Sequence, residues 1–160
     1  PVVILRPFNT FGPYQSTRAI IGELIIKCLR GEIIETTAGE QTREFNYVSN
    51  TVDGFIKAIE RKNDVLGKVI NLGSGEEINI KNLVTLIHKL SDSESELRIG
   101  ALEYRPTEIW RMFADSNLAK GTLDWVPIID FNEGIIKTIE WNRQYLDTMG
   151  RSGALVKLTN

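Results

Sequence analysis

The chain has 160 residues, of which 42% are hydrophobic and 25% are charged, the composition of one globular domain. Its 19 lysines and arginines nearly balance its 21 aspartates and glutamates, so no net charge draws the chain to nucleic acid or to an anionic membrane. No apolar run approaches the roughly 20 residues of a membrane helix, and no secretory leader opens the sequence. The single cysteine, Cys28, lies in an apolar run, so we expect a buried, unreactive thiol in a cytoplasmic protein.

The first expected element is a strand at residues 2–5, which are continuously apolar and mostly β-branched. This pattern is typical of a parallel strand covered on both faces, and we expect its neighbours to come from sequence that is not present here. A turn-rich segment at residues 9–15 leads into a helix at residues 16–30, where apolar residues recur at helical spacing. Gly31 can supply the left-handed residue that ends this helix.

Strands and helices alternate along the middle of the chain. Strands are expected at residues 32–37, 43–48 and 68–72, with turns at Gly39 and at the run Gly73-Ser74-Gly75. Asn50 can cap a helix whose apolar residues keep the register of one buried face: Val52, Phe55, Ile56 and Ile59. A further amphipathic helix begins near Asn79.

The last third of the chain continues the alternation. We expect a short strand at residues 97–99, an extended segment at 104–114, helices at 116–120 and 132–145, and a mobile tail at the end. This order of elements predicts an α/β fold without internal repeats.

Complete catalytic motifs are missing from the sequence. The Gly73-Ser74-Gly75 run follows a strand and precedes a helix, but it lacks the third glycine and the downstream acidic residue of a dinucleotide site. No Tyr-x-x-x-Lys pair, nucleophile elbow, P-loop or metal-type Cys/His cluster occurs. The only histidine, His88, is expected at the edge of a helical apolar stripe and not in a metal or catalytic site.

Three arginines lie in aromatic and apolar surroundings: Arg43, Arg105 and Arg111. The planar guanidinium fork suits phosphate oxygens, so two or three of them converging on one cleft would hold a pyrophosphate. The alternative is that they form surface ion pairs. The residues alone do not decide between these two interpretations.

Four sequence blocks resemble the extended short-chain dehydrogenase/reductase family of NAD-dependent sugar-nucleotide epimerases and dehydratases. They occur in the family's order and spacing and read RPFNTFGPYQSTRA, GEQTREFNYVSNTVDGF, VINLGSGEEINIKNLV and RPTEIWRMFADSNLAKGTLDW. The resemblance implies the carboxy-terminal, substrate-binding part of an extended Rossmann-type α/β fold. It implies that residues 1–12 end the dinucleotide-binding sheet of a missing half, that residues 13–148 form a sugar-nucleotide-binding domain, and that residues 149–160 are a mobile tail.

The resemblance also implies a set of site residues. Those that match the family's substrate-binding positions are Asn9, Arg18, Ala19, Thr36, Ala38, Arg43, Asn71, Arg105 and Glu108, and those near the nicotinamide are Phe8 and Thr10. The catalytic tyrosine and lysine of the family have no counterpart in this sequence. The expected cofactor is NAD, held mainly by the missing half, and the expected substrate is a UDP-, dTDP- or GDP-sugar.

The blocks are most similar to the 4,6-dehydratase branch that acts on UDP-N-acetylhexosamines. We therefore expect the substrate-binding portion of a dehydratase, inactive alone. A sugar-nucleotide 4-epimerase or a UDP-glucuronate decarboxylase would share the pocket. A third alternative is a non-catalytic module that binds nucleotide sugars, or that assembles with a partner chain or its own copy to complete the sheet.

Overall fold

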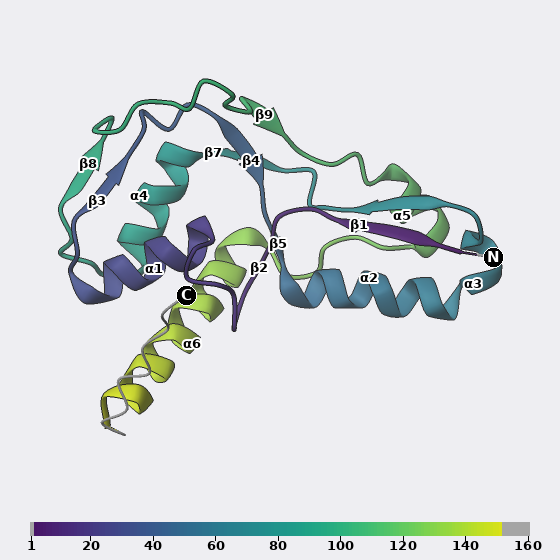
Figure 1. Ribbon diagram of the computed structural model, residues 1–160. Helices are drawn as coiled ribbons and strands as arrows, with labels where there is room; N and C mark the ends of the chain where they lie inside the picture. The colour runs from purple at the N-terminus through teal and green to yellow at the C-terminus, as the bar shows by residue number, and fades with distance from the viewer. Residues whose placement is uncertain (1, 152–160) are drawn as a thin grey trace.

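Two lobes make up the part of the chain that the computed structural model describes, residues 2–151, with side chains described to residue 148 (Figure 1). One lobe is built on a pair of strands and the other on three helices. We call them the sheet lobe and the helical lobe.

The sheet lobe contains β1 (Ile4–Pro7) and β6 (Val69–Leu72), which pair in parallel with Ile4 opposite Val69. The helices α2 (Val48–Glu60), α3 (Lys62–Val65) and α5 (Asn117–Leu123) accompany this pair (Figure 1). The lobe has its own hydrophobic cluster, formed by Ala58, Val65, Ile70, Leu72, Ala119, Leu123 and Trp125. Both strands lie close to where the apolar runs of the sequence predict them.

The helical lobe packs α1 (Ile20–Arg30), α4 (Ile80–Leu90) and α6 (Phe131–Arg151) against one another. A parallel pair, β3 (Ile34–Thr36) and β8 (Leu97–Ile99), lies beside α1 and α4 (Figure 1). The second and larger hydrophobic cluster fills this lobe, and Cys28 is buried in it as expected. Gly31 has φ 67° and ends α1, which confirms the predicted helix end.

Short strands connect the lobes. The strand β4 (Thr42–Glu44) pairs with β7 (Glu77–Asn79) in antiparallel and with β9 (Arg111–Met112) in parallel, whereas β5 (Asn46–Tyr47) pairs with β2 (Thr10–Phe11). The single strand predicted at residues 43–48 is therefore two strands. The chain leaves one sheet for another at Phe45, whose ring is buried in the core.

Two predicted helix starts are wrong and one is confirmed. The helix α1 begins at Ile20 and not at residue 16, because Ser16 to Ala19 form a turn closed by a hydrogen bond from the Ala19 amide to the Ser16 carbonyl. The helix α2 begins at Val48, so Asn50 lies inside it and not at its cap. Asn79 does cap α4, because its side chain accepts a hydrogen bond from the Asn82 amide at 2.7 Å.

The buried face predicted for α2 is also wrong. Its packed residues are small or polar, namely Asn50, Thr51, Gly54 and Ala58. The predicted apolar stripe points outward instead, since Val52, Phe55, Ile56 and Ile59 are all exposed. The helix turns its small side to the strands because Gly54 contacts Leu72 and Trp125 closely, leaving no room for a larger residue.

The carboxy-terminal helix is longer than predicted, because α6 runs from Phe131 to Arg151. The tail prediction for residues 149–160 therefore overlaps the helix, and residues 152–160 lie outside the described residues. None of the helices in the described chain is both long and apolar enough to cross a membrane.

Candidate functional site

A cavity of about 310 Å³ lies in the helical lobe beside α1, β3 and the segment before β9. Three residues from the predicted substrate set line it: Thr36, Arg105 and Glu108. Apolar side chains of Leu24, Ile34 and Leu102 complete its wall. The sequence pattern assigned the apolar residues of α1, Leu24 among them, to the hydrophobic core. It therefore did not predict that they also line a cavity.

Arg43 joins this group through Glu108. Its guanidinium donates a hydrogen bond to the Glu108 carboxylate at 2.8 Å, and both side chains are only 15% exposed. A second guanidinium nitrogen donates to the Thr42 carbonyl oxygen at 2.7 Å. The structure thus brings Arg43 and Glu108, 65 residues apart in sequence, into one ion pair at the cavity.

Ion pairs neutralise most of the acidic residues that line the cavity. Glu23 pairs with Lys27 at 2.7 Å, and Glu35 pairs with Arg98 at 3.1 Å. Arg105 is exposed and forms no ion pair with any side chain of the described residues. A cation with free donors therefore lies at the cavity, where an anionic group can reach it.

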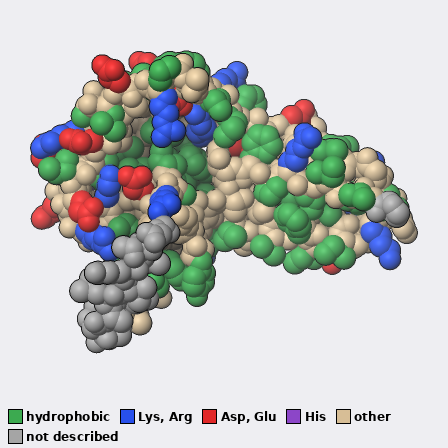
Figure 2. All heavy atoms as spheres, in the orientation of Figure 1, with side chains coloured by type: hydrophobic (Ala, Val, Ile, Leu, Met, Phe, Trp, Pro, Cys, Tyr) green, Lys and Arg blue, Asp and Glu red, His purple; other side chains and the backbone are tan. Residues whose placement is uncertain are grey.

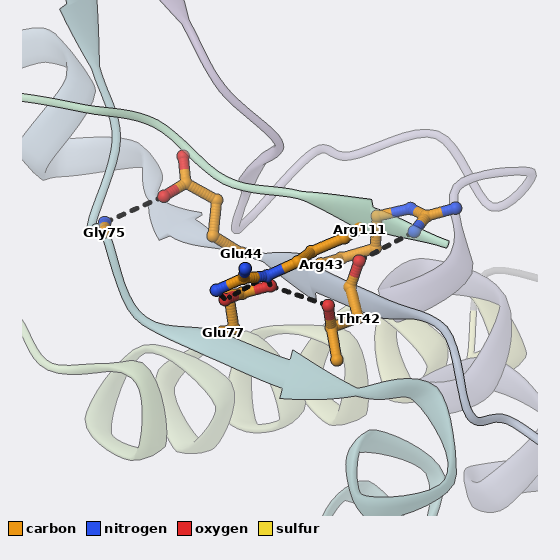
Figure 3. Close-up of polar contacts among 6 residues, drawn as sticks. All are labelled: Thr42, Arg43, Glu44, Gly75, Glu77 and Arg111. Atoms are coloured by element: carbon orange, nitrogen blue, oxygen red, sulfur yellow. Dashed lines mark hydrogen bonds and ion pairs between the residues drawn. The ribbon is translucent and has the colours of Figure 1, made fainter. Parts of the chain in front are cut away.

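Arg111, the third arginine of the sequence pattern, does not line this cavity. It binds both carboxylate oxygens of Glu77, with contacts of 2.6 and 2.9 Å (Figure 3). Its guanidinium carbon also lies 4.6 Å from the ring centre of Phe113. Its hydrogen bonds and that of Thr42 lower the pKa of Glu77. The ion-pair interpretation therefore holds for Arg111.

A second group of predicted residues lies where β1 and β6 end. The Asn9 side chain donates to the Glu44 carbonyl oxygen at 3.0 Å, and the Thr10 hydroxyl lies 3.0 Å from the Thr51 hydroxyl. The Asn71 side chain donates to the Asp115 carbonyl oxygen at 3.2 Å. Carboxyl ends of parallel strands are the usual ligand-binding edge of an α/β sheet.

The remaining predicted residues do not line the cavity. Arg18 and Ala19 precede α1, and Arg18 is exposed. Ala38 is exposed in the turn before Gly39, and Phe8 follows β1 with its amide bonded to the Leu72 carbonyl oxygen. The substrate and cofactor roles of these residues stay predictions.

Glu44 is a buried carboxyl that the sequence did not single out. Its side chain has no exposed surface, and its Oε2 accepts a hydrogen bond from the Gly75 amide at 2.8 Å (Figure 3). Burial raises the pKa of this carboxyl. Its neighbours in the sequence, Arg43 and Phe45, give no signal that the Glu44 side chain is enclosed.

The Gly73-Ser74-Gly75 run does not have the geometry of a dinucleotide-binding loop. The Gly73-Ser74-Gly75 turn leads into the strand β7 and not directly into a helix. The Gly75 amide, which would have to face a phosphate, is bonded to Glu44. His88 lies with its Nε2 2.9 Å from the Ser95 carbonyl oxygen, and residues 2–151 contain no group of three side chains placed to hold a metal ion.

Comparison with known proteins decides the family. The family model described as GDP-mannose 4,6 dehydratase matches residues 1–138. The chain belongs to this family of extended short-chain dehydrogenases/reductases. The α/β fold and the assignment to a carboxy-terminal part agree with this membership.

Relatives in the family catalyse several reactions. The chain is 34% identical over 149 residues to UDP-glucuronic acid decarboxylase 1 of Xenopus tropicalis, with 91% of this chain and 34% of the relative covered. It is 33% identical over 156 residues to dTDP-D-glucose 4,6-dehydratase of Bos taurus, with 90% and 41% covered. The chain thus spans well under half the length of these relatives.

A solved structure in the family has the same fold as this chain. UDP-glucuronic acid 4-epimerase of Bacillus cereus, in complex with UDP-glucuronic acid and NAD, superposes with a TM-score of 0.80 at 28% identity. The match covers 91% of this chain and 46% of the epimerase. The described lobes therefore correspond to about half of a solved family member.

Proposed function

We propose that this chain is the sugar-nucleotide-binding part of an NAD-dependent 4,6-dehydratase for UDP-N-acetylhexosamines, and that it is inactive alone. The observation that carries the proposal is the cavity lined by Thr36, Arg105 and Glu108, with an unpaired arginine at its wall. The family membership supports it, because named relatives act on UDP- and dTDP-linked sugars.

The side chains around the cavity suit a nucleoside diphosphate. The free guanidinium of Arg105 can bind two phosphate oxygens at once, which a point charge cannot do. Glu108 can accept a hydrogen bond from a ribose hydroxyl while it holds Arg43. The Thr36 hydroxyl is suited to a hydrogen bond with one edge of a base, and the apolar wall is suited to packing against one face of that base.

The contribution of this chain to the reaction is positioning. Binding the diphosphate fixes the sugar at the ends of β1 and β6, where Asn9 and Asn71 lie, and a fixed geometry lowers the entropic part of the barrier. The hydride chemistry belongs to NAD, which the rest of such an enzyme would hold. Without a Tyr-x-x-x-Lys pair, the isolated chain has no base for the oxidation of C4.

Calorimetry on the isolated chain tests the binding half of the proposal. We expect UDP and UDP-N-acetylglucosamine to bind, and Arg105→Ala to weaken both by about tenfold or more, as for the loss of a charge-assisted hydrogen bond worth about 1.5–3 kcal/mol. Arg61→Ala is the matched control, because Arg61 is an exposed arginine of the sheet lobe. Equal affinities of wild type and Arg105→Ala would sink the proposal.

Product analysis tests the other half. We expect no 4-keto sugar from UDP-N-acetylglucosamine with NAD and the isolated chain, and its appearance would contradict the inactivity.

A 4-epimerase or a UDP-glucuronate decarboxylase is the second candidate, favoured by the decarboxylase and epimerase among the matched relatives. Identifying the product after the cofactor-binding half is added distinguishes these enzymes. A non-catalytic module would give no product even after that half is added.

A further inference from the structure

Gln41 is a buried polar residue in the wall of the cavity. It lies between the Gly39 turn and β4, is only 8% exposed, and lines the same cavity as Arg105 and Glu108. Figure 2 shows the helical lobe hollowed on one face, with hydrophobic side chains in the hollow and charged side chains around it. A polar group enclosed in such surroundings finds its hydrogen-bond partners in the protein, in water or in a ligand.

The side-chain oxygen of Gln41 has no hydrogen-bond donor. Its Oε1 is buried, and no residue of the part of the chain that the structure describes donates to it. The side-chain nitrogen, in contrast, donates to the Thr37 hydroxyl oxygen at 3.4 Å. An amide oxygen that is buried without a donor costs free energy, so its presence in a native structure calls for an explanation. A donor that a ligand brings into the cavity is the explanation that the position of Gln41 supports.

The backbone around Gln41 is held in place by the start of α4. The Ile80 amide donates to the Gln41 carbonyl oxygen at 3.1 Å, and the Lys81 amide donates to the Gly39 carbonyl oxygen at 3.0 Å. Gly39 has φ 71°, and a Cβ there would lie 2.5 Å from the Lys81 backbone nitrogen, so the turn packs tightly on the helix. The terminal torsion of a glutamine is soft, so the amide can turn toward a bound group while the backbone stays fixed.

An acceptor in this place distinguishes nucleobases by their N–H groups. Uracil and thymine have an imide N–H between two carbonyl groups, whereas the ring nitrogen of cytosine at the same position is an acceptor. The Gln41 oxygen can accept from the imide N–H, but against cytosine it would face another acceptor. A site built to bind an N–H rejects an analogue that lacks it, because the buried polar group is then left unpaired.

The size of the cavity favours a base with one ring. Guanine also carries an N–H beside a carbonyl group, so the acceptor alone does not exclude it. The cavity volume of about 310 Å³ is near the lower end of the roughly 300–1,000 Å³ found for small-molecule sites. A pyrimidine with its ribose therefore suits this volume better than a purine does.

We propose that Gln41 selects the base of the nucleotide: its side-chain oxygen accepts the imide N–H of uracil or thymine, and this bond discriminates against cytosine. The inference rests on the proposed function, because it takes the cavity to hold a nucleoside diphosphate. Arg105 binds the diphosphate that all such nucleotides share, so it contributes affinity without a choice of base. Gln41 contributes the choice.

Calorimetry with UDP and CDP on this chain tests the assignment. The two ligands have the same ribose and diphosphate, so the contribution of Arg105 cancels in the ratio of their affinities. We expect UDP to bind about tenfold or more tightly than CDP, as for one buried hydrogen bond that is made or left unmade. Gln41→Met, which keeps the length of the side chain but removes the amide, should bring the ratio close to one. Gln144→Met is the matched control, because Gln144 is an exposed glutamine of α6 outside the cavity wall, and it should leave the ratio unchanged.

A modified ligand gives a second readout that does not depend on the folding of a variant. UDP methylated on the imide nitrogen lacks the donor, and we expect the wild-type chain to bind it about tenfold or more weakly than UDP. Equal affinities for UDP and CDP, an unchanged ratio in folded Gln41→Met, or full affinity for methylated UDP would each overturn the proposal. GDP binding as tight as that of UDP would overturn the assignment to a one-ring base. If UDP binds without any preference over CDP, this inference fails and the proposed function stands, whereas the absence of all nucleotide binding refutes both.

Discussion

Asn50→Ala should destabilise the protein strongly, because the Asn50 side chain makes four hydrogen bonds. The buried Asn50 side chain accepts hydrogen bonds from the amides of Ile128 and Ile129, both at 3.0 Å. It also donates to the Ile129 carbonyl oxygen at 2.8 Å and to Asn46 Oδ1 at 3.1 Å. Four bonds at about 1 kcal/mol each amount to about 4 kcal/mol, and the better helix propensity of alanine offsets about 0.5 kcal/mol of that loss.

Urea unfolding monitored by tryptophan fluorescence measures this change, and Trp125 lies next to the site because its indole donates to the Asn50 carbonyl oxygen. We expect the free energy of unfolding to fall by about 3.5 kcal/mol, with an unchanged m value. Asn63→Ala is the matched control, because Asn63 is an exposed asparagine of α3. A loss below about 1 kcal/mol for Asn50→Ala would refute the assignment of these bonds to the stability of the fold.

Two further predictions concern Glu44, the buried carboxyl at the end of β4. Burial raises the pKa of Glu44 above its unfolded value of about 4.3, so the folded state holds this proton more tightly and stability is lost as the pH rises through the folded pKa. Glu44→Gln removes that loss, so its free energy of unfolding relative to wild type should be higher at pH 7 than at pH 4 in urea titrations; equal differences at the two pH values would contradict this. Gly73→Ala would place a Cβ against Glu44 Oε1 and 2.6 Å from the Ala114 Cβ, and we expect it to destabilise by about 1–3 kcal/mol. Gly121→Ala in α5 meets no atom within 4 Å and serves as the control, so similar losses for both glycines in thermal unfolding would be evidence against the steric explanation.

The elements that the sequence predicted well are those whose local pattern coincides with the final packing. The helix α1 carries its apolar residues on one face, and this face is the one buried in the helical lobe. Its end depends on one residue, Gly31, whose lack of a Cβ allows the left-handed conformation. Local chemistry was sufficient in both cases.

The errors occurred where a distant partner decides the outcome. The stripe of α2 has the periodicity of a buried face, yet the strands pack on Gly54 and Ala58 instead. Asparagine commonly caps helices, but the side-chain oxygen of Asn50 accepts hydrogen bonds from the amides of residues 128 and 129, far along the chain. Periodicity states that a helix has an apolar side, not what will cover it.

Three residues of the predicted substrate set lie around one cavity, whereas the other predicted residues lie elsewhere and their roles stay predictions. The motifs placed Thr36, Arg105 and Glu108 in one site, and the structure places all three around one cavity. The pairing of Arg43 with Glu108 joins two blocks 65 residues apart, which spacing alone cannot show. It leaves Arg105 as the free cation and Arg111 bound to Glu77 on a different part of the surface.

The presence of two hydrophobic clusters without a shared residue has a consequence for cooperativity. A protein with two separate cores can open one of them locally while the other stays folded, at a free-energy cost below that of global unfolding. The sheet lobe has the smaller cluster and the apolar stripe left in water, so we expect sub-global unfolding to begin there and native-state proteolysis to cut within α2 before α1 or α4. A partner that covers this lobe would then act on the protein as a stabilising ligand, making the two lobes unfold together.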